Sequence, residues 1–141
     1  VSVLALQNIS HLFAVFKQAA ALLTDHGLFL FVINHPAFRI PKASSWGWQG
    51  QDQQFRIVDK YMSELKQPIT THPGEENSPV TWSFHRPLQH YFKALQANKF
   101  QVLDLEEWVS PKASEPGTRA AAEDRARKEI PLFMTILARK S

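Results

Sequence analysis

The sequence contains no cysteine among its 141 residues. Disulfide bonds, thiolate metal sites and cysteine nucleophiles are therefore excluded within it, and we expect a protein of the reducing cytoplasm. Long apolar segments are also missing, because the longest run, from Gly27 to Ile33, is far shorter than the roughly 20 residues that cross a bilayer. We therefore predict a soluble cytoplasmic protein with no membrane partner.

An excess of charge of one sign is absent as well. The chain has 16 Lys and Arg against 13 Asp and Glu, a net charge of +3, and its basic residues are spread along the sequence. This balance is too even for a basic binding stripe, so we predict no nucleic-acid partner. The 6 histidines include no pair spaced by four and no clustered carboxylates, so we predict no metal site.

The residues that are present suit a globular domain, since 44% are hydrophobic and 11% are aromatic. The first residue is Val1 rather than Met, and it opens inside an apolar segment without the charged start of a signal peptide. We therefore expect further residues to precede Val1. No internal repeat divides the chain.

The first 34 residues carry the clearest pattern. Segment 1–9 is apolar and predicts a strand, and Leu28 to Ile33 is a continuous apolar run that suits a strand covered on both faces. Between them, Ser10 is expected to cap an amphipathic helix and Gly27 to end it. The helix places its apolar residues at helical spacing: Leu12, Phe16, Ala19 and Leu23. A strand, a helix and a buried strand predict a parallel, right-handed βαβ unit.

Segment 39–86 differs in character and is expected to be an insertion. Its first part, SSWGWQGQDQQ, is polar and predicts a long loop or lid. Between Phe55 and Phe84 a weak alternation predicts two short strands. Turn-forming residues between them predict a hairpin connection: Pro73, Gly74, Asn77, Ser78 and Pro79.

The remaining residues predict two helices and two strands. Pro87 suits the first turn of a helix that presents Leu88, Tyr91, Phe92 and Leu95 on one face. Segment 100–109 predicts an edge strand because acidic residues interrupt its apolar ones. Segment 119–129 predicts a solvated helix with charge pairs four residues apart, and 130–140 predicts a buried strand.

In this order the elements resemble the carboxyl-terminal half of class I S-adenosylmethionine-dependent methyltransferases. Segments 1–9, 28–34, 100–108 and 131–140 would be the fourth to seventh strands of that family's sheet. The sequence LLTDHGLFLFVIN is of a kind common in this fold. The segments NHPAF, SSWGW and SFHRPL resemble a bacterial branch that acts on small molecules. The resemblance implies an α/β, Rossmann-like sheet with an antiparallel last strand and a β-hairpin lid inserted at 39–86.

The chain departs from that family in one respect. The glycine-rich turn after the family's first strand, and the acidic residue that binds the cofactor ribose, have no counterpart here. The 5 glycines form no G-x-G, and the one G-x-x-G runs from Gly47 to Gly50 in the polar segment. We therefore expect residues 1–141 to form a single partial domain that lacks most of the S-adenosylmethionine site and is inactive alone.

Candidate site residues follow from strand ends and from the resemblance. His35 follows the buried strand at its carboxyl end, where ligands bind in α/β sheets, and His85 occupies a similar junction. Either is a candidate base or substrate-orienting group, and the alternative for each is a structural histidine at a strand end or turn. The resemblance implies that Ala5, Leu6 and Gln7 contact the cofactor and that Asn8 positions the acceptor, unless Asn8 is a plain cap or turn residue.

Four further residues are candidates for substrate contact: Trp48, Arg56, Tyr61 and Arg86. Aromatic residues in a lid can close over a flat substrate, and an arginine can bind an acidic group. The alternatives are that the insertion's aromatic residues form its own small core and that Arg86 is a surface residue.

The resemblance implies methyl transfer from S-adenosylmethionine to a small molecule. The alternative is a non-catalytic α/β interaction or regulatory module. Such a module would pair through the exposed edge of its sheet with a partner or with a second copy, as a homodimer.

Overall fold

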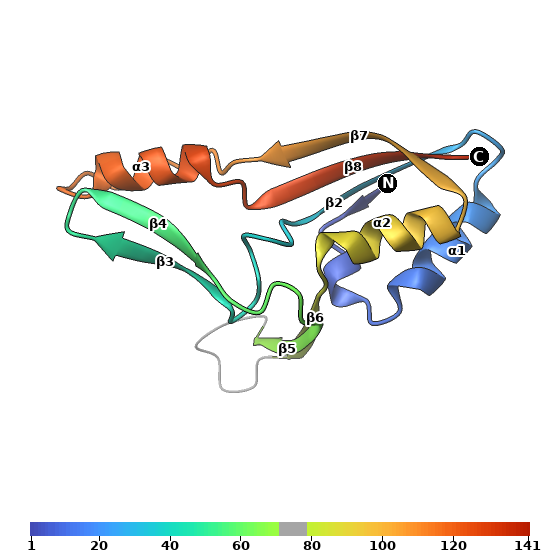
Figure 1. Cartoon of the computed structure of the whole chain (residues 1–141), viewed down its shortest axis with the longest axis horizontal. Coiled ribbons are helices and arrows are strands. Elements are labelled where there is room, and N and C mark those ends of the chain that lie inside the picture. Colours follow the sequence, from blue (N-terminus) through green and yellow to red (C-terminus); the bar gives the residue numbers. More distant parts are fainter. Residues whose placement is uncertain (71–78) are drawn as a thin grey trace.

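A computed structural model describes residues 1–70 and 79–141 of the chain (Figure 1). Its main sheet has the order β1 (Ser2–Val3), β2 (Leu28–Asn34), β8 (Phe133–Lys140) and β7 (Phe100–Trp108). β1 is parallel to β2, as predicted, whereas β8 runs antiparallel to both β2 and β7. The last strand of the chain therefore lies between two earlier ones, and β7 is at an edge, as its acidic residues predict.

Two helices pack on one face of this sheet. α1 (Leu12–Leu22) and α2 (Leu88–Ala97) lie side by side on the same side of the strands (Figure 1). The core beneath them is aromatic, with Phe16 of α1 packed against Phe29 and Phe31 of β2 at centroid distances of 5.7 and 5.5 Å. Alternate residues of a strand face opposite sides, so Leu30 lies on the other face, where it is only half-buried. The sequence predicts that β2 is covered on both faces. Among the described residues, helices cover only one of these faces.

The segment before α1 differs from the predicted strand. β1 has only two residues, because Leu4 adopts a left-handed backbone with φ of 52° and turns the chain into a 3₁₀ helix, η1 (Leu6–Asn8). α1 begins after His11 rather than Ser10, and no side chain caps it. The prediction of a strand through Ile9 with a serine cap is therefore wrong.

Gly27 does not end α1. The helix ends at Leu22, and Gly27 closes a separate turn by donating its N–H to the carbonyl of Thr24 at 2.9 Å. A Cβ at this position would lie 2.8 Å from that carbonyl oxygen, which explains the glycine. The sequence therefore predicts the break correctly but not the kind of turn.

The predicted polar loop of the insertion is a β-hairpin, formed by β3 (Ser44–Gln49) and β4 (Gln53–Val58). Gly47 pairs with Phe55, whose ring fills the space that a Cβ would need, at 2.8 Å. A second pair follows, β5 (Leu65–Thr70) with β6 (Val80–His85). These are paired as predicted, while Pro73, Gly74, Asn77 and Ser78 of the expected connection lie outside the described residues.

The helix α3 (Ala120–Glu129) packs beside β4 at the opposite end of the molecule from α1 and α2 (Figure 1). Ala122 and Ala126 are buried against the hairpin, and the Arg119 guanidinium lies 4.6 Å from the Trp48 ring. Of the predicted charge pairs, Glu123 and Arg127 meet at 3.5 Å, whereas Arg125 instead donates to the carbonyl of Asp52 at 2.5 Å. One side of this helix is therefore packed rather than solvated.

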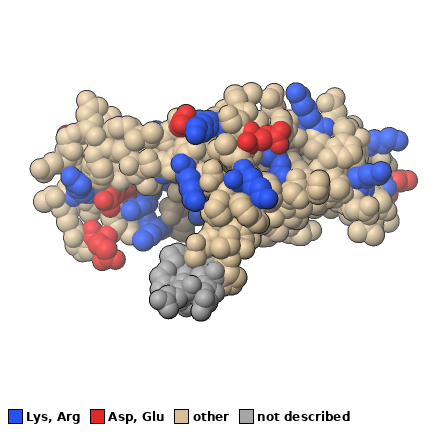
Figure 2. Space-filling view, turned by 90° about the horizontal axis from the view of Figure 1, so that it is seen from below, with Lys and Arg blue, Asp and Glu red and all other residues tan. Residues whose placement is uncertain are grey.

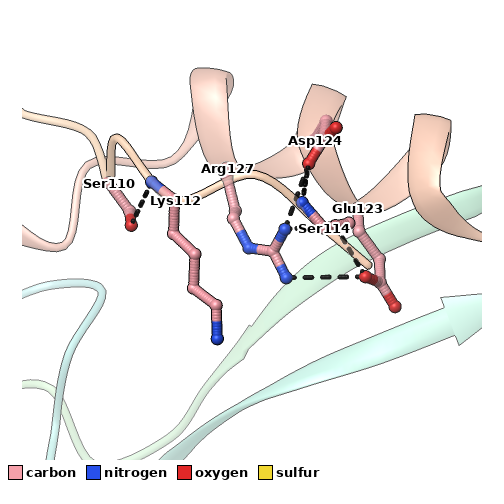
Figure 3. Close-up of polar contacts among 6 residues, drawn as sticks. All are labelled: Ser110, Lys112, Ser114, Glu123, Asp124 and Arg127. Atoms are coloured by element: carbon pink, nitrogen blue, oxygen red, sulfur yellow. Dashed lines mark hydrogen bonds and ion pairs between the residues drawn. The ribbon is translucent and has the colours of Figure 1, made fainter. Parts of the chain in front are cut away.

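A polar cluster fastens the preceding linker to α3 (Figure 3). The Ser114 N–H donates to Asp124 Oδ1 and its hydroxyl donates to Glu123 Oε2, both at 2.8 Å. Arg127 donates to Ser114 and to Asp124, so that three charged side chains share one serine. The hydrogen bond from the Ser114 backbone is the main cause that lowers the pKa of Asp124 below its usual value.

Substitution of Phe16 by alanine is expected to lower the free energy of unfolding by about 3–5 kcal/mol, because Phe16 is fully buried among aromatic rings. Phe13, on the same helix, is 52% exposed, so F13A is the matched control with an expected cost below about 1 kcal/mol. Denaturant unfolding followed by circular dichroism measures both. Equal costs would contradict the packing of α1 described here.

Candidate functional site

A small polar cavity lies where β1 and β2 end. The chain leaves β1 through Leu4, whose N–H donates to the carbonyl of Val32 at 2.8 Å, and continues into η1. Residues 83–86, at the end of β6, close the cavity from the insertion. Its volume is about 10 Å³, and it is lined by Gln7, Asn34, Pro36, Arg39, Pro41, Ser83, Phe84, His85, Arg86 and Tyr91.

Arg86 is the most constrained group of this cavity, with only 5% of its surface exposed. Its Nη2 donates to the carbonyls of Ile9 and Ser10, both at 2.7 Å. The Tyr91 side chain lies beside it: burial raises the pKa of that phenol, while the charge of Arg86 and a hydrogen bond from it act in the opposite direction. Arg86 therefore ties the end of β6 to the loop after β1, and it is not a surface residue.

Only one nitrogen of the His85 ring makes a hydrogen bond to the described residues. Its ring Nε2 lies 2.8 Å from the carbonyl of Tyr61, which can only accept, so this nitrogen carries the proton. Burial is the main cause that lowers the pKa of His85 below its usual value; the Tyr61 bond raises it and the charge of Arg86 lowers it further. The neutral ring leaves Nδ1 as a free acceptor, with no hydrogen bond to it among the described residues.

His35 is 4% exposed, and both of its nitrogens are engaged. Nδ1 accepts the N–H of Ala37 at 3.1 Å, so Nε2 carries the proton and donates to Glu107 Oε1 of β7 at 2.7 Å. The ring also lies 4.8 Å from that of Phe38. This geometry links the turn after β2 to the edge strand, the structural role named above as the alternative for His35.

The structure places the other predicted substrate residues in contacts of the insertion. Trp48 lies under Arg119, and Tyr61 accepts the N–H of Leu88 at 3.2 Å. Arg56 donates to the carbonyl of Phe38 at 2.7 Å. Burial and the nearby charge of Arg39 lower the pKa of Arg56. None of the three lines the cavity.

The loop predicted to contact the cofactor offers mainly its backbone and one side chain. Leu6 is 1% exposed and belongs to the core, whereas Ala5 and Asn8 are exposed. Gln7 donates its Nε2 to the carbonyl of Leu4 at 2.8 Å, while its buried Oε1 has no partner among the described residues. A buried acceptor without a partner beside an exposed turn is a feature that suits the binding of a polar group.

Sequence reasoning missed Arg39 and Tyr91. Arg39 follows β2 closely enough to be suspected as a strand-end residue, and burial lowers the pKa of its guanidinium, which lies 4.8 Å from the Phe133 ring. Tyr91 fits the apolar face of α2, and the sequence predicts it only as a core residue. Its position beside Arg86 is visible only in the structure.

A larger groove of about 620 Å³ lies between the start of α1 and α2. Its lining carries both signs of charge, including an ion pair of 3.4 Å between His90 Nδ1 and Glu64 Oε1. Figure 2 likewise shows Lys and Arg spread across one face of the molecule, with smaller groups of Asp and Glu among them. The described residues hold no group of three or more His, Asp or Glu that could bind a metal ion, and none of their helices is long and apolar enough to span a bilayer.

No family model matches the chain, and no curated protein matches it. Solved structures do match. A Listeria monocytogenes protein assigned as an S-adenosylmethionine-dependent methyltransferase matches 99% of this chain with a TM-score of 0.74 and 24% identity, over 59% of its own length. A Mesorhizobium loti S-adenosylmethionine-dependent methyltransferase matches 98% with a TM-score of 0.70 and 22% identity, again over 59% of its length.

A third such enzyme, from Clostridium acetobutylicum, matches 97% of the chain with a TM-score of 0.53 and 14% identity, over 55% of its own length. At these identities the likeness establishes the fold, which is the α/β fold of these methyltransferases. The chain spans 59% of the length of the first two solved chains.

Replacement of His35 by alanine is expected to destabilise the chain by about 1–3 kcal/mol, since the part-buried N–H of Ala37 would lose its acceptor. E107Q is the matched control: it keeps an acceptor for Nε2 on a half-exposed side chain, so its expected cost is below about 1 kcal/mol. Chemical denaturation measures both. An H35A variant as stable as the parent would show that the ring is not structural.

His85 predicts a pH dependence of stability. Because its pKa is lowered on folding, the unfolded chain binds more protons below about pH 6.5, the ordinary histidine value. The contribution of His85 is therefore complete above that pH and is lost as the pH falls. H85Q keeps a donor for Tyr61, so the stability gap between parent and variant should shrink on acidification. A nuclear magnetic resonance titration of the His85 ring above pH 6.5 would contradict this.

Proposed function

We propose that the chain is the carboxyl-terminal part of an S-adenosylmethionine-dependent methyltransferase that acts on a small molecule. The observation that carries this proposal is the strand order β1-β2-β8-β7, with antiparallel β8 between β2 and β7 and a polar cavity at the carboxyl ends of β1 and β2. In open α/β sheets this edge is where ligands bind.

The cofactor would supply an electrophilic methyl group. In this chain the turn from Ala5 to Gln7 would contact the cofactor, through main-chain atoms and through Gln7 Oε1, which has no partner among the described residues. Asn8, next in sequence, would position the acceptor. The sequence has no glycine-rich turn of the kind that holds the rest of the cofactor, so the 141 residues alone are proposed to be inactive.

Of the two candidate bases, His85 suits proton transfer better than His35. The neutral His85 ring lines the cavity, and its Nδ1 accepts no hydrogen bond from residues 1–70 or 79–141, whereas both nitrogens of His35 are occupied. Arg86 orients the acceptor, and Trp48, Arg56 and Tyr61 shape the insertion that covers the site. The cytoplasm is the proposed location.

Calorimetry with S-adenosylhomocysteine tests the proposal. The chain, produced together with any residues that precede it in its natural gene product, should bind at micromolar concentration, while the 141 residues alone should bind at least about tenfold more weakly, a difference of about 1.4 kcal/mol. An unchanged heat signal from the longer protein would refute the methyltransferase proposal. Methyl transfer by residues 1–141 alone would refute their proposed inactivity.

A second candidate is a non-catalytic module that pairs through the free edge of β1. An apolar groove of about 490 Å³ borders this edge and is lined by Ile9, Val15, Leu22 and Phe29 among others. Val1 and Val3 beside it are also exposed. Such a surface favours association with further polypeptide or with a second copy. Solution mass separates these views: a stable monomer argues against pairing of two copies, and a dimer favours it.

A further inference from the structure

The strand β7 has both an open edge and an open face. It is the outermost strand of the main sheet, with a ladder to β8 on one side and none on the other among the described residues (Figure 1). After an irregularity between Val102 and Asp104, alternate residues of β7 face away from α1 and α2: Asp104, Glu106 and Trp108. Unpaired main-chain groups along such an edge are a template for a further strand.

A groove of about 150 Å³ lies beside this edge, on the face that α1 and α2 leave open. Its lining comes from three neighbouring strands: Leu30, Asp104, Glu106, Trp108, Thr135 and Leu137. The ladders place Glu106 directly opposite Thr135, and they place Leu137 between Asp104 and Leu30, so these side chains are neighbours. One water needs roughly 10–15 Å³ and a whole ligand pocket roughly 300–1,000 Å³, so the groove suits a group the size of one side chain.

Thr135 of β8 contributes a buried hydroxyl to this groove. Only 7% of the residue is exposed, and its Oγ1 has no hydrogen-bond partner among the described residues. A buried polar atom without a partner is costly, and in this case it lines an open groove rather than a closed core. The hydroxyl is therefore available to a polar group that enters the groove, and it can accept a hydrogen bond from that group.

The two carboxylates of the groove favour a cation as the entering group. Glu106 accepts the Trp108 Nε1 proton at 2.7 Å, and Asp104 accepts the N–H of Leu105 at 2.8 Å, so each keeps one oxygen without a bond to the described residues. Neither belongs to any ion pair of residues 1–70 or 79–141. The remaining lining is leucine and an indole ring, which suit an aliphatic chain that carries a cation. A lysine side chain has this chemistry.

We propose that the open edge of β7 binds an extended polypeptide, which adds a strand to the main sheet and inserts a lysine side chain into the groove. Main-chain hydrogen bonds to β7 supply affinity, and the groove supplies selectivity. The added strand and β8 are two spacings of about 4.8 Å apart, which the chain of a lysine can bridge. Its ammonium lies between Asp104 and Glu106 and donates to Thr135 Oγ1. This docking does not depend on methyl transfer.

The charge of β7 disfavours a second copy of the same edge as the added strand. Asp104, Glu106 and Glu107 fall within four residues of each other. Two such edges side by side would bring carboxylates opposite carboxylates, which destabilises a sheet, whereas a strand with lysine opposite them places unlike charges together. The favoured partner is therefore a basic extended segment.

Two peptides test the proposal. One is a pentapeptide of threonine, valine, lysine, valine and threonine, blocked at both ends, and the other has norleucine in place of lysine. Each is titrated into the chain, produced with any residues that precede it in its natural gene product, and followed by amide shifts in nuclear magnetic resonance spectra. The lysine peptide should bind at least about tenfold more tightly, which is about 1.4 kcal/mol, with its largest shifts in β7. Equal affinities, no binding, or shifts confined to other elements would overturn the proposal.

n-Butylammonium separates the possible occupants, because it reproduces the lysine side chain without a backbone. It should bind at least about tenfold more weakly than the lysine peptide, since it forms no ladder with β7. An equal affinity would assign the groove to a small amine. A dimer in sedimentation whose dilution shifts the amides of β7 would assign the edge to a second copy. Either result would overturn the proposal.

A variant of Thr135 assigns the binding to the groove. T135V keeps the shape of the side chain and removes its hydroxyl, so the lysine peptide should lose at least about threefold in affinity. The denaturation midpoint should rise, because a buried hydroxyl without a partner is lost. T81V, at an exposed position of β6, is the matched control and should change neither. A lower midpoint with unchanged peptide affinity would show that the Thr135 hydroxyl is structural, against the proposal.

A double variant tests the carboxylates. In D104N/E106Q the lysine peptide should lose its advantage over the norleucine peptide, which falls below about threefold. E115Q/E129Q removes the same charge from exposed positions away from the groove and should keep the full advantage. Loss of the advantage in both double variants, or in neither, would contradict the proposed lysine site.

Discussion

Burial of the Arg86 charge is the constraint on which the site depends. A buried guanidinium without a carboxylate partner is costly, and here the carbonyls of Ile9 and Ser10 solvate it. These two bonds join positions 76 and 77 residues apart in sequence, so they connect the loop after β1, the end of β6 and the start of α2. The same guanidinium also lines the cavity at the ends of β1 and β2, so the lining is held by contacts between distant parts of the chain.

Local patterns allowed much of the fold to be predicted. The apolar run of β2, the acidic edge strand β7 and the helix α2 are each visible in a few consecutive residues. The β3–β4 hairpin was missed because its strands are polar, and their pairing depends on the fit of the Phe55 ring against Gly47. The first strand was overestimated because an apolar run does not reveal the left-handed turn at Leu4.

The candidate site could be predicted only in part, for a similar reason. His35 and His85 both follow a strand, and composition cannot tell them apart. The two histidines differ in their distant partners. Glu107 accepts a hydrogen bond from His35, whose other nitrogen is also bonded, whereas the carbonyl of Tyr61 engages only one nitrogen of His85 among the described residues. The apolar pattern of α2 correctly predicts that the Tyr91 ring is buried, but it does not predict what lies beside the hydroxyl. Residue type and spacing thus locate a site, while long-range hydrogen bonds decide which atoms in it remain available.

The position of β8 also determines the order in which this sheet can form. Among the described residues β2 and β7 share no ladder with each other, and each pairs with β8, which follows both of them in sequence. During synthesis, neither of these two ladders can form until residues 133–140 have emerged. The pairing of β2 with β7 through β8 is therefore a late, long-range step, whereas the contact of α1 with β2 joins residues close in sequence and can form earlier.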